Sequence, residues 1–187
     1  PIIDVHMHAD LPPHDVPPET PALCRPDPCQ GTGRATANHA ETLRKSLEAM
    51  DRYNIVKAFL SGVDPAVVQQ WVAAAPDRFI AAPFILQPGK PDLETLRRAY
   101  AAGRFSGMGE IATQLSGLPP NDPALEPYFA LAEERDLPVL IHTLGIGPYL
   151  PGFRSAIGSP LLLEEVLVRH TKLRLFVENS GYPYRDE

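Results

Sequence analysis

Two histidines near the start of the chain, His6 and His8, carry the most informative chemical pattern in the sequence. They follow a short apolar run, and Met7 stands between them. Successive side chains of a β-strand point to opposite faces, so residues i and i+2 share a face and the two imidazoles project together. Two imidazoles at the carboxyl end of a strand can bind one metal ion. Asp4 is expected on the same face, one layer deeper.

Two further ionisable residues stand at the ends of apolar runs. Glu110 follows Gly107 and Gly109, and glycines there allow another group to approach closely. His142 ends the run Pro-Val-Leu-Ile-His at 138–142. The carboxyl ends of parallel strands lie on one side of a sheet, so both residues are expected to converge with the histidine pair.

The resulting set, His6, His8, Glu110 and His142, predicts a site for one divalent ion, because imidazole and carboxylate together suit zinc, iron or manganese. Each residue also has a simpler interpretation when taken alone. A histidine at a strand end can cap a loop, and Glu110 can be a solvated or salt-bridged carboxylate. The joint occurrence at three strand ends favours the metal site.

The elements that would position these residues are short apolar runs alternating with helical patterns. Leu43, Leu47 and Met50 recur at helical spacing, and Asp64-Pro65 is typical of a helix start. Apolar runs without alternation indicate strands buried on both faces, as in a parallel sheet covered by helices. We expect strands at residues 2–8, 55–61, 79–86, 105–111, 137–142 and 172–179, and helices at 39–53, 64–75, 92–103, 123–136 (regular from Pro127) and 159–170.

This order of elements is compatible with a doubly wound sheet or with a (β/α) barrel, and periodicity does not separate the two. Long irregular segments are expected at 9–38 and 144–158, where proline and glycine are frequent. The length of 187 residues fits one domain, taken as residues 1–187.

Composition limits the function classes. The net charge of −6 argues against a nucleic-acid surface, which needs clustered Lys and Arg. No apolar run reaches the roughly 18 residues that span a bilayer, and no signal peptide precedes the first strand, so we expect no membrane contact and a cytoplasmic location. Cys24 and Cys29 are expected to be unpaired thiols, with a disulfide or a metal site as alternatives. Neither a phosphate-binding P-loop nor a serine-hydrolase elbow occurs.

The sequence resembles the amidohydrolase superfamily, within it the branch called amidohydrolase-related or amidohydrolase 2. Residues 2–8, 107–111, 138–142 and 173–183 carry the resemblance in one order along the chain. The resemblance implies a TIM-type (β/α) barrel and one or two divalent metal ions, zinc being the expected one. It also implies a small-molecule substrate whose amide, ester or lactone bond is attacked by metal-activated water, although some relatives are decarboxylases or hydratases.

The resemblance assigns His6 and His8 to the first metal pair and His142 to the ligand of strand five. It assigns Glu110 to the position of a metal-bridging, catalytic carboxylate. One departure concerns strand six, where the family has a histidine and this chain has Asn179. An amide oxygen is a weak ligand, so Asn179 is expected to be a degenerate ligand position and a second ion is not expected. The neighbouring Glu178 is expected to point away by strand alternation.

A second departure is length, since the family barrel has eight strands and the pattern here supplies six. The predicted fold is therefore an α/β, incomplete TIM-type barrel with about six of eight strand–helix units, apparently truncated at its C-terminal side. The aspartate of the eighth strand has no counterpart. Strands one and six would be apolar edges, so we expect self-association across the open barrel edge. Besides the hydrolase, two alternatives stay open: a metal-dependent non-oxidative decarboxylase, and an inactive barrel remnant acting as a binding or structural module.

Overall fold

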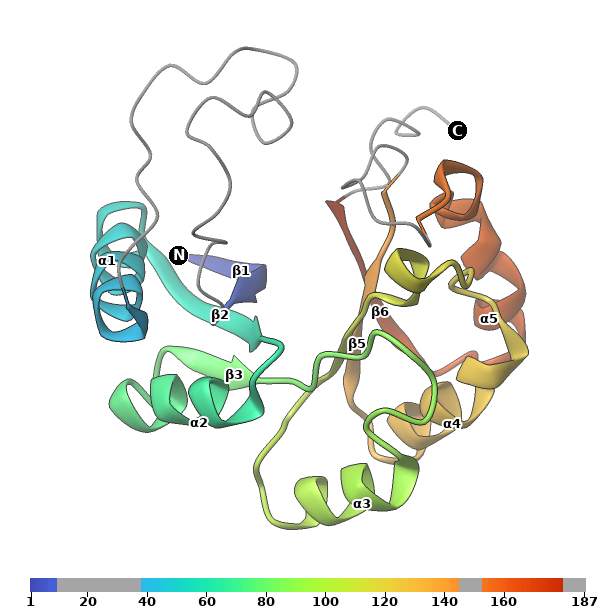
Figure 1. Cartoon of the computed structure of the whole chain (residues 1–187), viewed down its shortest axis with the longest axis horizontal. Helices are drawn as coiled ribbons and strands as arrows, with labels where there is room; N and C mark the ends of the chain where they lie inside the picture. Colours follow the sequence, from blue (N-terminus) through green and yellow to red (C-terminus); the bar gives the residue numbers. More distant parts are fainter. Residues whose placement is uncertain (10–37, 145–152, 180–187) are drawn as a thin grey trace.

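The computed structural model describes residues 1–9, 38–144 and 153–179. Parallel strands form the inside of the molecule and helices cover the outside (Figure 1). The strands are β1 (Ile2–His8), β2 (Ile55–Ser61), β3 (Phe79–Ala81), β4 (Met108–Ile111), β5 (Pro138–His142) and β6 (Arg174–Glu178). The α-helices are α1 (His39–Arg52), α2 (Pro65–Ala74), α3 (Leu93–Ala101), α4 (Glu126–Glu134) and α5 (Glu164–Arg169).

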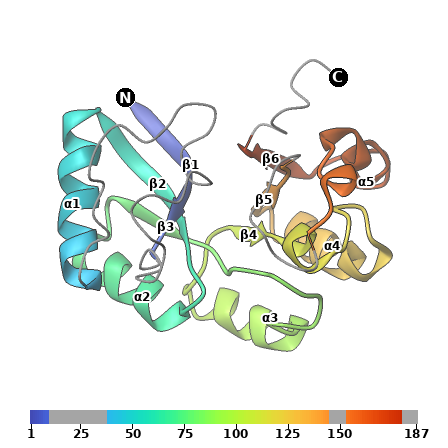
Figure 2. The ribbon, with the colours of Figure 1, turned by 45° about the horizontal axis from the view of Figure 1, so that its top comes forward.

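The strands lie in two parallel three-stranded sheets, β1-β2-β3 and β4-β5-β6 (Figure 2). A bridge between Ile85 and Ile111 joins them: Ile85 donates to the carbonyl of Glu110 at 2.8 Å and accepts from the amide of Ala112 at 2.8 Å. The spatial order therefore follows the sequence order, as in a (β/α) barrel rather than a doubly wound sheet. The described residues do not close the barrel.

Side-chain caps start three of the helices where the sequence indicates. Asn38, Asp64 and Asp92 accept hydrogen bonds from backbone amides in the first turns of α1, α2 and α3. Each cap satisfies a donor that a helix start would otherwise leave unpaired. Pro65 occupies the first turn of α2, where no backbone donor is needed, so the predicted start of that helix is confirmed.

Each sheet has its own apolar core. The first core packs α1 and α2 against β1–β3 around Met50, Leu60 and Trp71, each 1% exposed or less. The second core packs the remaining helices against β4–β6 around Phe129 and Ile141. The most deeply buried strands are β4 and β5 of the second sheet, since every residue of both is buried.

Several predicted boundaries are wrong in a way that the backbone explains. The third strand ends at Ala81 rather than at residue 86, because Pro83 has no N–H to give to a ladder. Ile85 returns to the sheet only as an isolated bridge. The fourth strand starts at Met108 rather than at residue 105, after a single bond from the Ser106 amide to the Ala81 carbonyl at 2.9 Å.

The later elements are also shorter than predicted. The segment after Ser159 begins as a 3₁₀ turn at Pro160–Leu163, and only Glu164–Arg169 is α-helical. The regular part of the fourth helix does begin after a 3₁₀ turn, near Pro127 as expected. The predicted loops at 9–38 and 144–158 fall largely outside the described residues, as do His14, Cys24 and Cys29. Among the residues described, no helix combines the length and the apolar character that crossing a bilayer requires.

The two edge strands expose apolar side chains. Ile2 and Ile3 of β1 are 53% and 56% exposed, and Phe176 and Val177 of β6 are each 37% exposed. The rings of Phe59 in β2 and Phe176 in β6 nevertheless lie 6.0 Å apart, centroid to centroid. The sheets therefore curl toward one another, and this curvature brings the ends of β1 and β6 to one mouth.

Candidate metal centre

The histidines of β1 project to the same side, as strand alternation predicts. Their Nε2 atoms are 3.0 Å apart, and both rings are partly exposed. The carboxylate of Asp4 accepts a hydrogen bond from the His6 amide at 2.9 Å, beside a register shift of β1 against β2. Ser61, the last residue of β2, lies with its hydroxyl 3.3 Å from Nδ1 of His8. With Nδ1–H donating to this hydroxyl, Nε2 of His8 is the unprotonated nitrogen, the form that can bind a metal ion.

Glu110 and His142 form the buried side of the site. The Glu110 Oε1 atom lies 2.7 Å from Nδ1 of His142, and both side chains are less than a tenth exposed. Gly109 permits this approach of β4 to β5, because its φ is +113° and a Cβ there would collide with the carbonyl oxygen of Leu140. The close approach predicted for the glycines of this segment is thus real.

The two sides meet at the second carboxylate oxygen of Glu110. Its Oε2 atom lies 3.4 Å from Nε2 of His6 and 3.2 Å from Nε2 of His8. Atoms that bind one ion at about 2.0–2.1 Å are themselves separated by about 3.0–3.4 Å, so the three separations fit a shared ion. His6, His8 and Glu110 form a group whose ligand atoms all lie within 4.8 Å of one another.

An unpaired polar atom gives a second sign that the group of His6, His8 and Glu110 fits a cation. Glu110 Oε2 is buried without a hydrogen-bond partner among the described residues, as is Nε2 of His142, which lies outside this group. A buried carboxylate oxygen without a donor is costly, and a metal ion would satisfy it. Two imidazole nitrogens and one carboxylate oxygen also form a donor set that binds zinc or manganese.

The electrostatics of the site keep Glu110 ionised. Burial by itself opposes the charge, but the hydrogen bond with His142, the close contact with His6 and the charge of His8 outweigh it and lower the pKa of Glu110. The pKa of His6 is raised: burial lowers it, and the contact with Glu110 and the charge of Glu178 raise it by more. The site is therefore negatively biased and suited to a cation.

Glu178 does not point away from the site, which corrects the expectation from strand alternation. Its side chain is 3% exposed and lies with Glu110 around a small void inside the barrel. Burial and the charge of Glu110 raise the pKa of Glu178. Asn179 reaches the site as well, with Nδ2 3.2 Å from Nδ1 of His142. Both side chains face the mouth because β6 ends at Glu178 and Asn179 turns at a φ of +58°.

Comparison with known sequences now decides the family. The sequence profile of a family described as amidohydrolase matches residues 3–187. The chain belongs to the amidohydrolase family. Members of this family are metal-dependent enzymes, which agrees with the group of His6, His8 and Glu110. None of the curated proteins compared by sequence matches this chain.

Solved amidohydrolase-type structures share the fold at low sequence identity. The 4-oxalomesaconate hydratase of Rhodopseudomonas palustris matches with a TM-score of 0.58 at 15% identity, covering 96% of this chain and 63% of that one. The 2,6-dihydroxybenzoate decarboxylase of Rhizobium matches with a TM-score of 0.55 at 16% identity, covering 96% and 66%. The 5-carboxyvanillate decarboxylase of Novosphingobium aromaticivorans, complexed with manganese, matches with a TM-score of 0.54 at 18% identity, covering 73% and 49%.

The amidohydrolase chain described here spans between about half and two thirds of the length of these three structures. The likeness establishes the parallel α/β architecture of a TIM-barrel enzyme, of which the described strands form an open part. It does not by itself identify a reaction, since the three relatives comprise a hydratase and two decarboxylases.

Three residues of the site escaped the sequence interpretation. Ser61 ends β2 next to the histidine strand, and the convergence of carboxyl ends would have indicated it. Glu178 was misplaced because the alternation was counted from Asn179, which lies outside β6, whereas Glu178 is the last residue of β6 and is in register with His142. Phe84, whose ring packs edge-on against His8 with centroids 6.0 Å apart, gave no signal, because it lies in the irregular segment after β3.

Proposed function

We propose that this chain forms the metal-binding part of a metal-dependent hydrolase that acts on an amide, ester or lactone bond. The observation that carries the proposal is the triangle of Nε2 of His6, Nε2 of His8 and Oε2 of Glu110, with sides of 3.0, 3.2 and 3.4 Å. We take these three residues as the ligands of a single divalent ion, with zinc as the expected metal.

A divalent ion bound there would activate water and polarise the scissile carbonyl. Glu110 contributes its ionised carboxylate, which would bind the ion and can accept a proton. His142 donates from Nδ1 to Oε1 of Glu110 and so fixes the direction in which Oε2 points. Ser61 orients the ring of His8 in the same manner. These roles need no residue outside the described part of the chain.

The environment of His142 supports a single ion rather than two. Asn179 presents a neutral amide beside Nδ1 of His142, where a second histidine would offer a stronger ligand. If Nδ1 donates to Glu110, the amide of Asn179 must turn its oxygen toward the ring, since Nδ2 cannot pair with another donor. We therefore propose Asn179 as a hydrogen-bond partner of the site and not as a metal ligand.

A metal-dependent non-oxidative decarboxylase is the second candidate. It is favoured by the similarity to two decarboxylases, of which the 5-carboxyvanillate enzyme is complexed with manganese. In a decarboxylase of this kind, the ion would bind the carboxylate of the substrate. His6, His8 and Glu110 would occupy three positions around the ion, and a further position would stay open for that carboxylate. Manganese then replaces zinc as the expected metal.

The two candidates differ in the product, so one assay separates them. Metal-free protein is reloaded with Zn²⁺ or Mn²⁺ and offered a panel of aryl esters and lactones and a panel of hydroxylated benzoates. Hydrolysis that needs metal and is lost in Glu110→Gln supports the hydrolase, and metal-dependent release of CO₂ supports the decarboxylase. Tight metal binding with neither reaction would leave the chain as a binding module and would contradict the proposal.

A further inference from the structure

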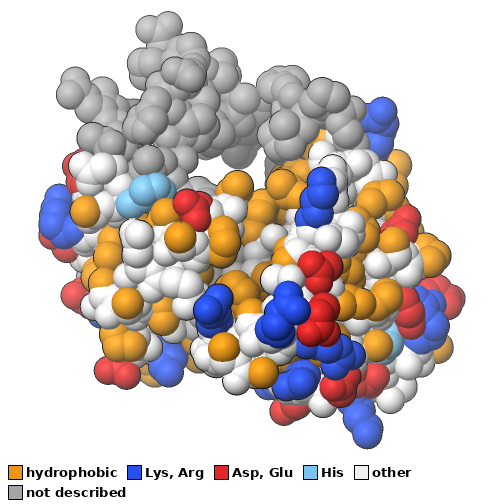
Figure 3. Space-filling view, turned by 60° about the horizontal axis from the view of Figure 1, so that its bottom comes forward, with side chains coloured by type: hydrophobic (Ala, Val, Ile, Leu, Met, Phe, Trp, Pro, Cys, Tyr) orange, Lys and Arg blue, Asp and Glu red, His pale blue; other side chains and the backbone are white. Residues whose placement is uncertain are grey.

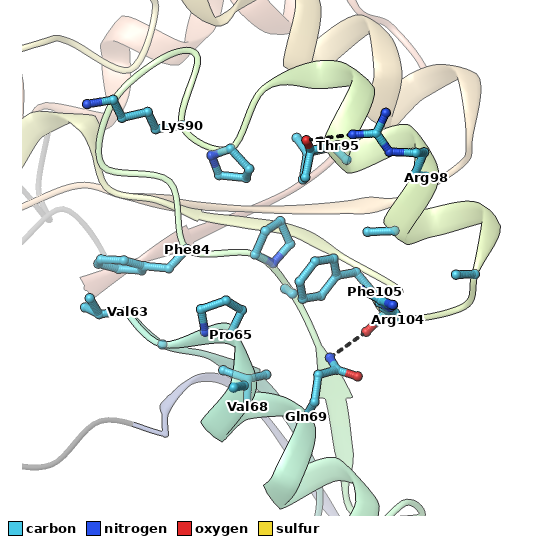
Figure 4. A pocket seen from close by; sticks show the side chains of 18 residues that line it. Val63, Pro65, Val68, Gln69, Phe84, Lys90, Thr95, Arg98, Arg104 and Phe105 are labelled. Carbon is cyan, nitrogen blue, oxygen red and sulfur yellow. Dashed lines mark hydrogen bonds between the residues drawn. The ribbon is translucent and has the colours of Figure 1, made fainter.

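A second cavity lies between helices α2 and α3, apart from the His6, His8 and Glu110 group (Figure 4). Its volume is about 840 Å³. Pockets that hold small molecules measure about 300–1,000 Å³, so the cavity has the size of a ligand site. Figure 3 shows the face that carries α2 and α3, where Lys and Arg side chains stand beside apolar ones.

The walls of the cavity are apolar and partly aromatic. In Figure 4 the side chains of Phe84, Phe105 and Pro65 surround its middle, with Val63 and Val68 beside them. Small residues leave the space between the helices unfilled; they are Gly62, Ala66, Ala82, Ala99 and Ala102. Val63 is 68% exposed and places an apolar edge beside the cavity.

The charges at the rim have one sign. Lys90, Arg98 and Arg104 line the cavity, and none of the 18 lining residues is an aspartate or a glutamate. Arg98 is ion-paired with Glu94 at 3.3 Å on the exposed side of α3, and Asp92 is engaged in capping that helix. A local excess of positive charge stands out in a chain whose net charge is −6.

We propose that this cavity binds a small organic anion with an apolar body, of the class of aryl carboxylates. The aromatic and proline side chains would stack on the ring, and the guanidinium groups at the rim would meet the carboxylate, for which their planar geometry is suited. The site is distinct from the candidate metal centre, because none of His6, His8 and Glu110 lines the cavity, although Phe84 lines it and also packs against His8. It does not depend on the proposed hydrolase activity.

Calorimetric titration with naphthalene-2-carboxylate tests the proposal, with the neutral 2-naphthalenemethanol as the matched probe. We expect the carboxylate to bind at least tenfold more tightly than the alcohol. The Lys90→Gln/Arg104→Gln variant should weaken binding of the carboxylate at least fivefold and leave the alcohol unchanged. Both side chains are exposed, so the fold should persist, which circular dichroism verifies.

Three further variants locate the bound probe. Ala102→Trp should fill one end of the cavity and weaken both probes. Arg97→Gln removes a cation of α3 that pairs with Glu134 instead of lining the cavity, and it should change neither affinity. His6→Ala/His8→Ala destroys the metal centre and should leave binding intact. Absence of binding, or binding that disappears in the histidine variant while it survives in Lys90→Gln/Arg104→Gln, would overturn the proposal.

Discussion

Strands β1 and β5 each end in a histidine of the candidate metal centre, yet they differ in burial, in pairing and in the exposure of that histidine. All of β5 is buried, from Pro138 to His142, and it pairs with a strand on each side. Within residues 1–9, 38–144 and 153–179, β1 pairs with β2 alone, and Ile2 and Ile3 are more than half exposed. The rings they carry follow the same contrast: His142 is 8% exposed, and the side chains of His6 and His8 are 25% and 38% exposed.

This contrast divides the site into a buried half, Glu110 and His142, and a half that lies on an edge strand, His6 and His8. Glu110 and His142 stand on buried strands and are hydrogen-bonded to each other. On the edge strand, Asp4 accepts a hydrogen bond from the His6 amide, and the Ser61 hydroxyl contacts the ring of His8. An ion would therefore enter from the β1 side and join an edge strand to the buried part of the barrel.

The largest expected effect concerns stability. Ile141→Ala removes a side chain that is 1% exposed in the second core, and it should lower the free energy of unfolding by about 2–5 kcal/mol. Ile3→Ala makes the same kind of change on β1, where the side chain is 56% exposed, and should cost no more than about 0.5 kcal/mol. Urea unfolding measures both. Equal losses would show that β1 is as well packed as β5.

The second effect concerns metal affinity and compares two residues of the buried half. Glu110→Gln removes a proposed ligand and should reduce the affinity by more than about 100-fold, the upper end of the loss expected for a supporting partner. His142→Gln should reduce it by about 10- to 100-fold, because His142 acts through its bond to Glu110. Competition with a chromophoric chelator measures both affinities. A loss in His142→Gln equal to that in Glu110→Gln would make His142 a direct ligand, as the family resemblance implies.

The third effect concerns the two edges. The exposed side chains of Ile3 and Val177 predict that the 187-residue chain self-associates across the open barrel edge. Ile3→Lys/Val177→Lys should raise the dissociation constant of the dimer at least tenfold, since charges on an edge strand oppose pairing. Sedimentation velocity over a range of concentrations measures it. A monomeric wild-type chain with full metal-dependent turnover would contradict this prediction.

The smallest effect concerns α3, the helix that connects the first sheet to the second, and it depends on pH. Asp92 caps α3 through the amide and hydroxyl of Thr95, and these hydrogen bonds lower the pKa of its carboxyl. A lowered pKa in the folded state means that the cap stabilises above the ordinary carboxyl pKa and is lost as the pH falls through the lowered value, below about 4. Asp92→Asn should keep the cap and remove its pH dependence. Melting curves of Asp92→Asn and wild type at pH 7 and pH 3 should diverge by a few degrees at most, and only at pH 3.

Much of this arrangement could be predicted from the sequence because it follows from short-range rules. The bounds of β2, the Asp64-Pro65 helix start and the shared side of His6 and His8 depend on apolar runs, caps and the two-residue period of a strand. The encounter of Glu110 with the histidine pair needed only the rule that parallel strands present their carboxyl ends on one side.

The rest depends on contacts that the sequence does not display. The early end of the third strand depends on where the missing N–H of Pro83 falls in the ladder, and the position of Glu178 follows from where β6 stops. The cavity between α2 and α3 arises from small side chains on these helices and on the segments beside them. Neither hydrophobic periodicity nor a sequence motif shows how far apart two helices will lie.

One measurement tests the central claim most directly: the number of divalent ions bound per chain by wild type and by His6→Ala/His8→Ala, determined by elemental analysis after dialysis. The account predicts about one tightly bound ion in the wild-type chain and none in the variant, with both proteins folded by circular dichroism. Stoichiometric metal in the His6→Ala/His8→Ala variant would show that the ion binds elsewhere, with Cys24 and Cys29 as the first residues to test, and would contradict the metal centre described here.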